Sequence, residues 1–278
     1  MDTFVPIAGE NLDLLSLVTY YTMLVAAYAL LGSFIFSWLT RTHVAPEHNT
    51  SRVLTAIIGL VAGISYFLIQ DYYKAYLQEL SDITDPQQRE LLGQQAYLAI
   101  GQLRYMDWTV TTPLLLIKTI MVMRVNPSKI KGLLTLIILG DLFMIVTGYI
   151  GEQQIGPGGE ILVAPRMFWG LVSTFGYLAV LYGLYQVWNK HRGQARPVEQ
   201  RAFKWMAIPT ITLWGVYPIG YILVALVPNL DFDWIHIAFS VADIANKVGV
   251  GVVAYLLGSY LLEQRIDVQS RDYAEHVG

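Results

Sequence analysis

The sequence predicts an all-α membrane protein, folded as a bundle of seven transmembrane helices. Of its 278 residues, 55% are hydrophobic and only 14% are charged. Soluble domains carry about 25% charged residues, so this deficit indicates that lipid covers much of the surface. Seven stretches also reach the roughly 20 mostly apolar residues that a helix needs to cross the hydrocarbon core. We therefore expect a single membrane domain over residues 1–278.

Short polar or Pro/Gly-rich connections separate the seven expected helices. Examples are "NPSKIKG" and "QQIGPGGE", whose proline and glycine residues interrupt helical structure. The expected spans cover residues 12–39, 53–76, 95–123, 130–151, 165–189, 202–228 and 234–263.

Basic residues predict the orientation of the bundle, because cytoplasmic loops carry an excess of lysine and arginine. If the N-terminus lies outside, only Lys74, Arg89 and Arg166 fall in outer loops, whereas most of the 18 basic residues fall in inner loops. The N-terminal stretch "MDTFVPIAGENLDLL" is acidic and lacks the basic start of a cleavable signal peptide. We expect a multi-pass protein of the plasma membrane, with its N-terminus outside and its C-terminus in the cytoplasm.

Charge and cysteine content narrow the classes of function. The net charge of −3 gives no indication of nucleic-acid binding. The absence of cysteine excludes disulfides, thiolate metal sites and cysteine nucleophiles. We expect neither an enzyme nor a metal site.

The third expected span contains "RYMDWTVTTPLLLIK", which places three charged residues in apolar sequence. Ionisable side chains in a transmembrane helix usually face the bundle interior and mark a functional path. Arg104, Asp107 and Thr111 share one face by their spacing. Lys118 returns to the same side about 16 Å further along the axis. This is the geometry of two stations on a proton path. The alternative is that Lys118 extends its amine to the cytoplasmic headgroups.

The next three spans add one carboxyl group and several aromatic residues. Asp141 lies in the fourth span, and Trp169 and Trp214 lie in the fifth and sixth, away from the interfaces where tryptophan normally collects. Such residues often form core, but they also suit the walls of a flat ligand site. In "LWGVYP", Pro218 opens the helix toward a cavity.

The seventh span contains "SVADIANKVGVGVV", in which Asp243 and Lys247 lie four residues apart on one helix face. The simplest interpretation is a buried ion pair that holds the bundle together. The alternative is that the desolvated lysine forms a Schiff base with a carbonyl ligand.

Four stretches, taken together and in this order, resemble the microbial rhodopsins over essentially the full chain: "RYMDWTVTTPLLL", "GDLFMIVTG", "LWGVYP" and "DIANKVGVG". The resemblance implies all-trans-retinal bound to Lys247 as a protonated Schiff base, with Asp107 and Asp243 as counterions and Arg104 below them. It implies that Asp141 is buried behind the pocket. The retinal-binding residues that it implies are Lys247, Trp108, Thr112, Met144, Gly148, Trp169, Ser173, Trp214, Tyr217 and Pro218.

The residues Asp107, Thr111 and Lys118 resemble the third-span motif of light-driven outward proton pumps. Chloride pumps lack the carboxylate, sodium pumps resemble Asn-Asp-Gln, and inward pumps tend to lose the aspartate that is Asp243 here. The departure is Lys118, where a carboxylic proton donor is usual, although a small group of bacterial pumps has lysine. Burial favours the neutral form of an amine. We therefore expect Lys118 to take up a cytoplasmic proton and pass it inward.

Further positions add weaker expectations. The second-span histidine of many relatives is replaced by Leu68, as aligned in "GISYFLIQ". Asp231 and Asp233 are candidates for proton release, although solvated loop carboxylates are the simpler interpretation. Gly170 resembles the glycine that admits a carotenoid antenna in some members, although glycine in such helices more often serves close packing.

Other functions remain open at this stage. They are a photosensor that signals to a partner, a light-driven pump or channel for another ion, and a seven-helix protein without a chromophore. The C-terminal "EQRIDVQSRDYAEHVG" holds no recognisable output domain, which disfavours a self-contained sensor. Because relatives form trimers or pentamers, we also expect a homo-oligomer in the lipid bilayer.

Overall fold

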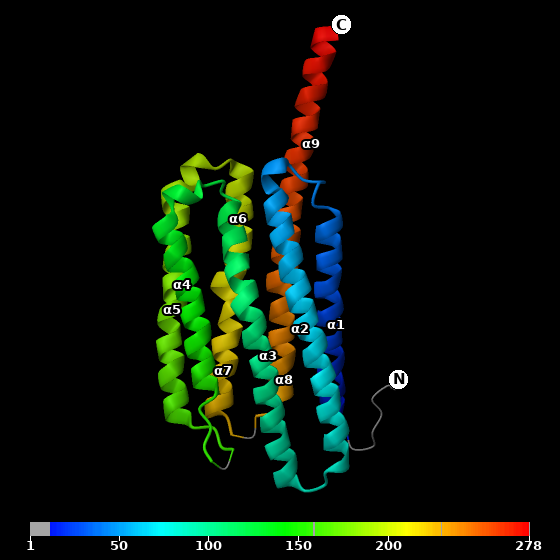
Figure 1. Ribbon diagram of the computed structural model, residues 1–278, viewed down its shortest axis with the longest axis vertical. Coiled ribbons are helices and arrows are strands. Elements are labelled where there is room, and N and C mark those ends of the chain that lie inside the picture. The colour runs from blue at the N-terminus through cyan, green and yellow to red at the C-terminus, as the bar shows by residue number, and fades with distance from the viewer. Residues whose placement is uncertain (1–11, 158, 229, 278) are drawn as a thin grey trace.

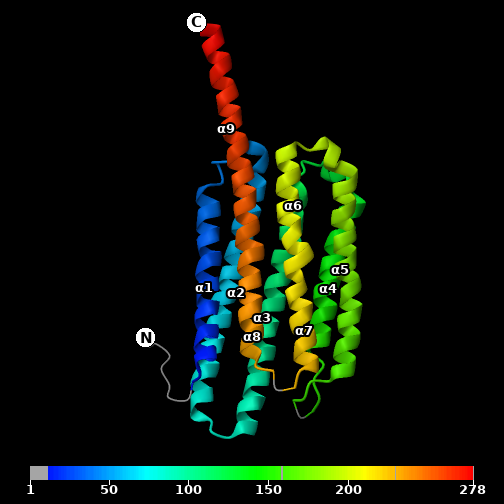
Figure 2. The same cartoon turned by 180° about the vertical axis from the view of Figure 1, so that it is seen from behind.

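The computed structural model describes residues 12–157, 159–228 and 230–277, which form an all-helical bundle (Figure 1). The remaining positions of the predicted domain, 1–11, 158, 229 and 278, lie outside the described residues. Seven rods lie side by side along the long axis, and short loops join each rod to the next (Figures 1 and 2). The seven-helix membrane bundle predicted from the sequence is therefore confirmed.

The first five rods are single helices, and the last two are each interrupted by a turn of different geometry. The single helices are α1 (Leu14–Leu39), α2 (Asn49–Asp82), α3 (Pro86–Met121), α4 (Lys131–Glu152) and α5 (Val163–His191). The sixth rod comprises α6 (Pro197–Thr212), a 3-10 turn (Leu213–Gly215) and α7 (Val216–Leu226). The seventh comprises α8 (Phe232–Ile244), a π turn (Ala245–Gly249) and α9 (Val250–Val277).

Local chemistry accounts for several of these boundaries. The side chain of Asp13 accepts a hydrogen bond from the Ser16 backbone N–H, 2.8 Å away, and so caps α1. Pro86 and Pro197 occupy the first positions of α3 and α6, where the missing proline N–H leaves no helical bond unmade. Pro218 cannot donate a helical bond to the carbonyl of Trp214, which lies in the 3-10 turn of the sixth rod.

The helices agree with the expected spans, but three of the rods are clearly longer. The seventh rod, expected at 234–263, runs from Phe232 to Val277. The span expected at 53–76 belongs to a helix that runs from Asn49 to Asp82, and the span expected at 95–123 belongs to one that begins at Pro86. Among the described residues, 6 helical rods are long and apolar enough to cross a membrane by composition. The rod that does not meet this criterion is α3, because charged and polar residues interrupt its apolar sequence.

Small residues bring neighbouring rods close together. A Cβ atom added to Gly176 of α5 would lie 2.5 Å from the carbonyl oxygen of Gly140 on α4, so the two backbones are in direct contact. Ala26 and Ala27 of α1 likewise pack against Ala62 of α2. Close approach of this kind is how helices associate in lipid, where apolar burial gives little advantage.

The outer surface of the bundle is apolar, as lipid requires. On α5, Leu171, Phe175 and Leu178 are 62%, 65% and 52% exposed. Beyond the bundle, α9 continues as an exposed helix that projects past the other rods (Figures 1 and 2). We name that side of the bundle the α9 end, and the opposite side, where α2 turns into α3, the α2–α3 end.

Candidate functional site

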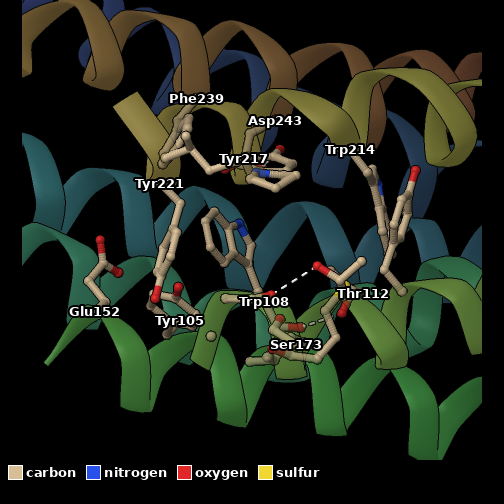
Figure 3. Close-up of a pocket in the computed structure, with 18 of the residues that line it drawn as sticks. Tyr105, Trp108, Thr112, Glu152, Ser173, Trp214, Tyr217, Tyr221, Phe239 and Asp243 are labelled. Carbon is tan, nitrogen blue, oxygen red and sulfur yellow. Dashed lines mark hydrogen bonds between the residues drawn. The ribbon is translucent and has the colours of Figure 1, made fainter. Parts of the chain in front are cut away.

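A cavity of about 460 Å³ lies inside the bundle, between α3, α4, α5 and the sixth and seventh rods. Its walls are mostly aromatic and aliphatic, and Figure 3 shows Trp108, Tyr217, Tyr221 and Phe239 gathered around it. Apolar walls with a few polar groups are typical of a small-molecule site.

A buried amine is the reactive group of this cavity. Lys247 is 3% exposed and belongs to the π turn that interrupts the seventh rod. Its Nζ donates a hydrogen bond to Asp107 Oδ2 and lies 3.5 Å from Asp243 Oδ2. Turns of π geometry often occur at functional sites, because they redirect one side chain out of the regular helical pattern. The structure therefore brings the lysine and both carboxylates together.

The two carboxylates differ in their hydrogen bonds. Asp243 accepts from the Tyr66 hydroxyl at 2.8 Å and from the Tyr217 hydroxyl at 2.6 Å, so both of its oxygens are engaged. Asp107 Oδ1, in contrast, has no hydrogen-bond partner among the described residues. One carboxylate is held by two tyrosines, and the other keeps an oxygen free to accept a proton.

Arg104 completes this cluster toward the α2–α3 end. Its Nη1 donates to the Tyr66 hydroxyl at 2.8 Å and lies 4.0 Å from Asp243 Oδ2. The guanidinium also lies over the Phe239 ring, 5.5 Å from the ring centre. Sequence reasoning did not identify Tyr66, because a tyrosine in an apolar span carries no motif of its own.

The chain belongs to the bacteriorhodopsin-like family. Residues 16–259 match the model of that family, described as bacteriorhodopsin-like protein. The chain is 34% identical to a bacteriorhodopsin of Haloterrigena sp. (strain arg-4) over 216 residues, which cover 77% of this chain and 76% of that protein. It is 25% identical to the green-light absorbing proteorhodopsin of Gamma-proteobacterium EBAC31A08 over 252 residues, or 89% of this chain and 88% of that protein.

A solved structure agrees with this assignment. The crystal structure of Exiguobacterium sibiricum rhodopsin has a TM-score of 0.73 at 25% identity and covers 88% of this chain and 97% of its own. The bacteriorhodopsin-like protein is therefore a multi-pass membrane protein of the plasma membrane. Its family consists of light-driven pumps and photoreceptors rather than enzymes.

Most of the predicted pocket residues of this bacteriorhodopsin-like protein line the cavity. Trp108 comes from α3 and Trp214 from the 3-10 turn of the sixth rod (Figure 3). The other predicted residues that line the cavity are Thr112, Met144, Gly148, Ser173, Tyr217, Pro218 and Lys247.

Trp169 is the exception, because it is not among the described residues that line the cavity. From α5 the cavity is lined by Met167, Gly170, Leu171, Ser173, Thr174 and Tyr177. The Trp169 ring packs edge-on against Phe168, with ring centres 5.7 Å apart. The contact of Trp169 with retinal stays a prediction.

Gly170 lines the cavity beside an aromatic ring. A Cβ atom added at this position would lie 2.8 Å from Cε1 of Tyr221, so glycine leaves room for that ring. Contact with Tyr221 is therefore one physical reason for a glycine at this position.

Lys118 lies away from the cavity, toward the α9 end of α3. Its side chain is 0% exposed and donates to Thr55 Oγ1 at 3.2 Å, so the amine does not extend to the bundle surface. The hydroxyl of Thr111, between Asp107 and Lys118, donates to the Asp107 backbone carbonyl at 2.9 Å.

Asp141 is fully buried on α4. Its Oδ2 accepts from the Thr112 hydroxyl at 2.8 Å, which links the carboxyl group to the cavity wall.

Two further expectations are corrected by the structure. Leu68 is 50% exposed on the outer surface, so its side chain points away from Asp107. Asp233 is not a solvated loop carboxylate: it is 7% exposed and accepts from Tyr73 at 2.6 Å and from Ser16 at 2.9 Å. Asp231, in contrast, is exposed, and as the N-cap of α8 it accepts from the Asp233 backbone N–H.

A second buried ion pair was missed because its members flank the loop between α4 and α5. Arg166, expected in an outer loop, is 0% exposed and lies 3.7 Å from Glu152. The Tyr97 hydroxyl donates to Glu152 Oε1 at 2.5 Å. Glu152 also lines the cavity, near Tyr105 and Tyr221 (Figure 3).

Proposed function

We propose that this protein is a light-driven outward proton pump that carries all-trans-retinal on Lys247. The observation that carries the proposal is the buried Lys247 amine at an aromatic cavity, with the carboxylates of Asp107 and Asp243 beside it. Family membership supports the same conclusion.

The residues present fit retinal. A long apolar polyene needs an enclosed site with flat walls and a reactive amine, and the 460 Å³ cavity offers aromatic walls and Lys247. When bound as a protonated Schiff base, retinal supplies light absorption and a change of shape at the Lys247 nitrogen. The carboxylates of Asp107 and Asp243 favour the protonated state of that nitrogen.

Asp107 is the proposed acceptor of the Lys247 proton. It contacts the Lys247 nitrogen directly, and its Oδ1 has no partner among the described residues. Asp243 is less suited to that role, because the hydroxyls of Tyr66 and Tyr217 already occupy its oxygens. Asp243 and Arg104 therefore keep the charge of the site balanced while Asp107 changes its protonation.

Lys118 is the proposed donor that returns a proton to Lys247. Lys118 is eleven positions after Asp107 on α3, which places its amine about 16 Å nearer the α9 end. It lies in the bundle interior, as an internal proton carrier must. We propose that the α9 end faces the cytoplasm, in agreement with the distribution of basic residues.

Two alternatives predict different behaviour in light. A photosensor needs no donor on the second side of Lys247, so the buried position of Lys118 favours a pump. A pump or channel for another ion remains the other alternative.

Illumination of cells in unbuffered medium distinguishes these functions. Outward pumping acidifies the medium, and a protonophore abolishes the effect. Alkalinisation that a protonophore strengthens would indicate transport of another ion or passive proton entry, and no pH change would indicate a sensor. The Lys247→Ala variant is the control and should form no pigment with added all-trans-retinal. A visible band in that variant would overturn the attachment site.

A carotenoid antenna at Gly170 is a secondary proposal. Gly170 and Leu171 both line the cavity, and Leu171 is also 62% exposed on the outer surface of α5. A long apolar pigment could therefore lie along this surface near the retinal site. Addition of hydroxylated carotenoids should produce an energy-transfer band in the excitation spectrum, and its absence with several carotenoids would end the proposal.

A further inference from the structure

Two buried cations lie near each other at the α9 end without a carboxylate partner. Arg52 of α2 is 1% exposed and Lys118 of α3 is 0% exposed. Among the described residues, neither forms an ion pair with an aspartate or glutamate. Buried charges are normally paired, so this arrangement calls for a physical explanation.

Neutral groups hold the Arg52 guanidinium in place. It donates to Thr40 Oγ1 at 2.6 Å and to the carbonyl oxygens of Phe36 and Gly251 at 3.5 Å and 3.4 Å. The rings of Phe36 and Tyr255 also lie about the guanidinium, with centres 5.1 Å and 4.8 Å away. Thr40 caps the C-terminus of α1, where the helix dipole favours a cation. Because no anion neutralises it, Arg52 keeps its full positive charge.

The surroundings of Lys118 suit a neutral amine. Its one hydrogen-bond partner among the described residues is Thr55, whose own hydroxyl donates to the Ser51 carbonyl at 2.8 Å. A protonated lysine has three N–H donors, and burial leaves them without water. A neutral amine needs fewer partners.

Thr55 connects the two cations. Arg52 and Thr55 are separated by one turn of α2, and both are buried. A Cβ atom added to Gly251, whose carbonyl accepts from Arg52, would lie 2.8 Å from the methyl group of Thr55. Burial is the larger influence that favours a neutral Lys118 amine, and the repulsion from the nearby Arg52 charge acts in the same direction. In a protein interior such a repulsion is screened far less than in water.

We propose that Arg52 is a positioning residue that keeps the Lys118 amine neutral in the dark. The amine then takes up a cytoplasmic proton only after Lys247 has lost its own. This inference rests on the proposed donor role of Lys118. It also explains why a lysine occupies the position: a carboxylic acid beside Arg52 would be ionised and would have no proton to give.

Other ionisable groups around this end do not replace Arg52. The side chains of Glu47 and Glu199 lie within 4.0 Å of Arg196, which engages them at the rim of the bundle. The ionisable residue that α9 contributes beside Arg52 is Tyr255. His48, one turn before Arg52, is also buried, and its Nε2 has no hydrogen-bond partner among the described residues. Glu199 is the one ionisable residue among the buried residues of α6, and α9 contributes the apolar Val250, Ala254, Leu257 and Leu261 to the adjoining core.

Flash photolysis with a soluble pH dye tests the proposal. In the unmodified protein, proton uptake should accompany or precede the return of a proton to the Lys247 nitrogen, and the return should slow as the pH rises. In Arg52→Gln, burial alone acts on Lys118, so a larger fraction of the amine should be protonated in the dark. Uptake should then shift toward following the return, whose rate should depend less on pH near neutrality. Arg52→Lys, which keeps the charge, should preserve the unmodified order.

Arg41→Gln is the matched control, because Arg41 is an arginine at the same end whose side chain donates to the Trp38 carbonyl at the surface. It should leave both the order and the pH profile unchanged. If Arg52→Gln retains the order and pH profile of the unmodified protein, the proposal is overturned.

A second test leaves Arg52 in place and does not depend on the stability of Arg52→Gln. In Lys118→Asp, the return of the proton to Lys247 should be as slow as in Lys118→Met, because Arg52 keeps the new carboxylate ionised. Adding Arg52→Gln to Lys118→Asp should accelerate the return at least tenfold, about 1.4 kcal/mol in the barrier. A rapid return in Lys118→Asp alone would contradict the proposal.

The two proposals fail in different ways. If Lys118→Met leaves the rate of return unchanged, the donor role itself is wrong. If Lys118→Met slows the return but Arg52→Gln behaves as the unmodified protein, only the role of Arg52 is wrong.

Discussion

The hydroxyl of Thr112 donates a hydrogen bond to the buried carboxyl group of Asp141, 2.8 Å away, and thereby joins α3 to α4 beside the cavity. The same hydroxyl lies 2.8 Å from the Trp108 carbonyl, so one side chain bridges the cavity wall and the neighbouring helix. A contact of this kind fixes the distance between two rods that each contribute residues to the site.

Thr112→Val should destabilise the pigment, because it keeps the shape of the side chain but leaves Asp141 without this bond. An unpaired buried polar group costs about 1–3 kcal/mol. Thermal loss of the visible band measures the effect. Thr109→Val is the control, since the Thr109 hydroxyl bonds only the Tyr105 carbonyl of its own exposed helix face. Equal losses in the two variants would show that the link to α4 contributes nothing.

Asp107→Asn should abolish light-driven acidification and shift the visible band to longer wavelength. The amide cannot accept the Lys247 proton, and the loss of a negative charge beside that nitrogen weakens the stabilisation of its positive charge. Light-induced pH changes and the absorption spectrum provide the two measurements.

Asp243→Asn provides the contrast, because it removes a carboxylate that accepts from both Tyr66 and Tyr217. It should mainly lower the yield and thermal stability of the pigment. Continued acidification by Asp107→Asn would show that another group accepts the proton.

Gly170→Ala should strain the cavity wall. The new Cβ would lie 2.8 Å from Cε1 of Tyr221, so the ring must shift, and overpacking of this kind costs about 1–3 kcal/mol. Thermal bleaching measures the cost. Gly32→Ala is a matched control in α1, where nothing lies within 4 Å of the added atom. Because Tyr221→Leu also removes the hydrogen bond to the Arg166 carbonyl, the comparison is made within that variant. If Gly170→Ala costs no further stability when added to Tyr221→Leu, the ring is the cause.

Much of the fold can be predicted from the sequence, because each helix that crosses the bilayer needs about 20 mostly apolar residues in a row. The charges of α3 and of the seventh rod were equally visible, since Arg104, Asp107, Lys118 and Lys247 stand out against apolar neighbours. The meeting of Arg104, Asp107 and Lys247 in one site followed from a resemblance, because helical spacing relates residues only within one helix.

The features that sequence reasoning missed depend on contacts between rods. The π turn around Lys247 has no sequence signature here. The sequence places Arg166 and Glu152 near a loop, because burying an unpaired charge is unfavourable. Their burial is understood only when the ion pair between them is known. Asp233 is buried for a similar reason, as Tyr73 and Ser16 supply its donors from other helices.

Arg166→Gln should be among the most destabilising single changes at the α2–α3 end. Arg166 pairs with Glu152 at 3.7 Å, and both side chains are buried, so the change leaves an uncompensated carboxylate. Breaking a buried pair typically costs about 3–5 kcal/mol. Arg265→Gln is the control: it removes an exposed pair with Glu47 at 3.0 Å, which is worth about 0–1 kcal/mol. Arg166→Gln should lose its pigment at a much lower temperature than Arg265→Gln. Adding Glu152→Gln to Arg166→Gln should restore part of the lost thermal stability. Similar stability in the two single variants would mean that water reaches Glu152 from the α2–α3 end.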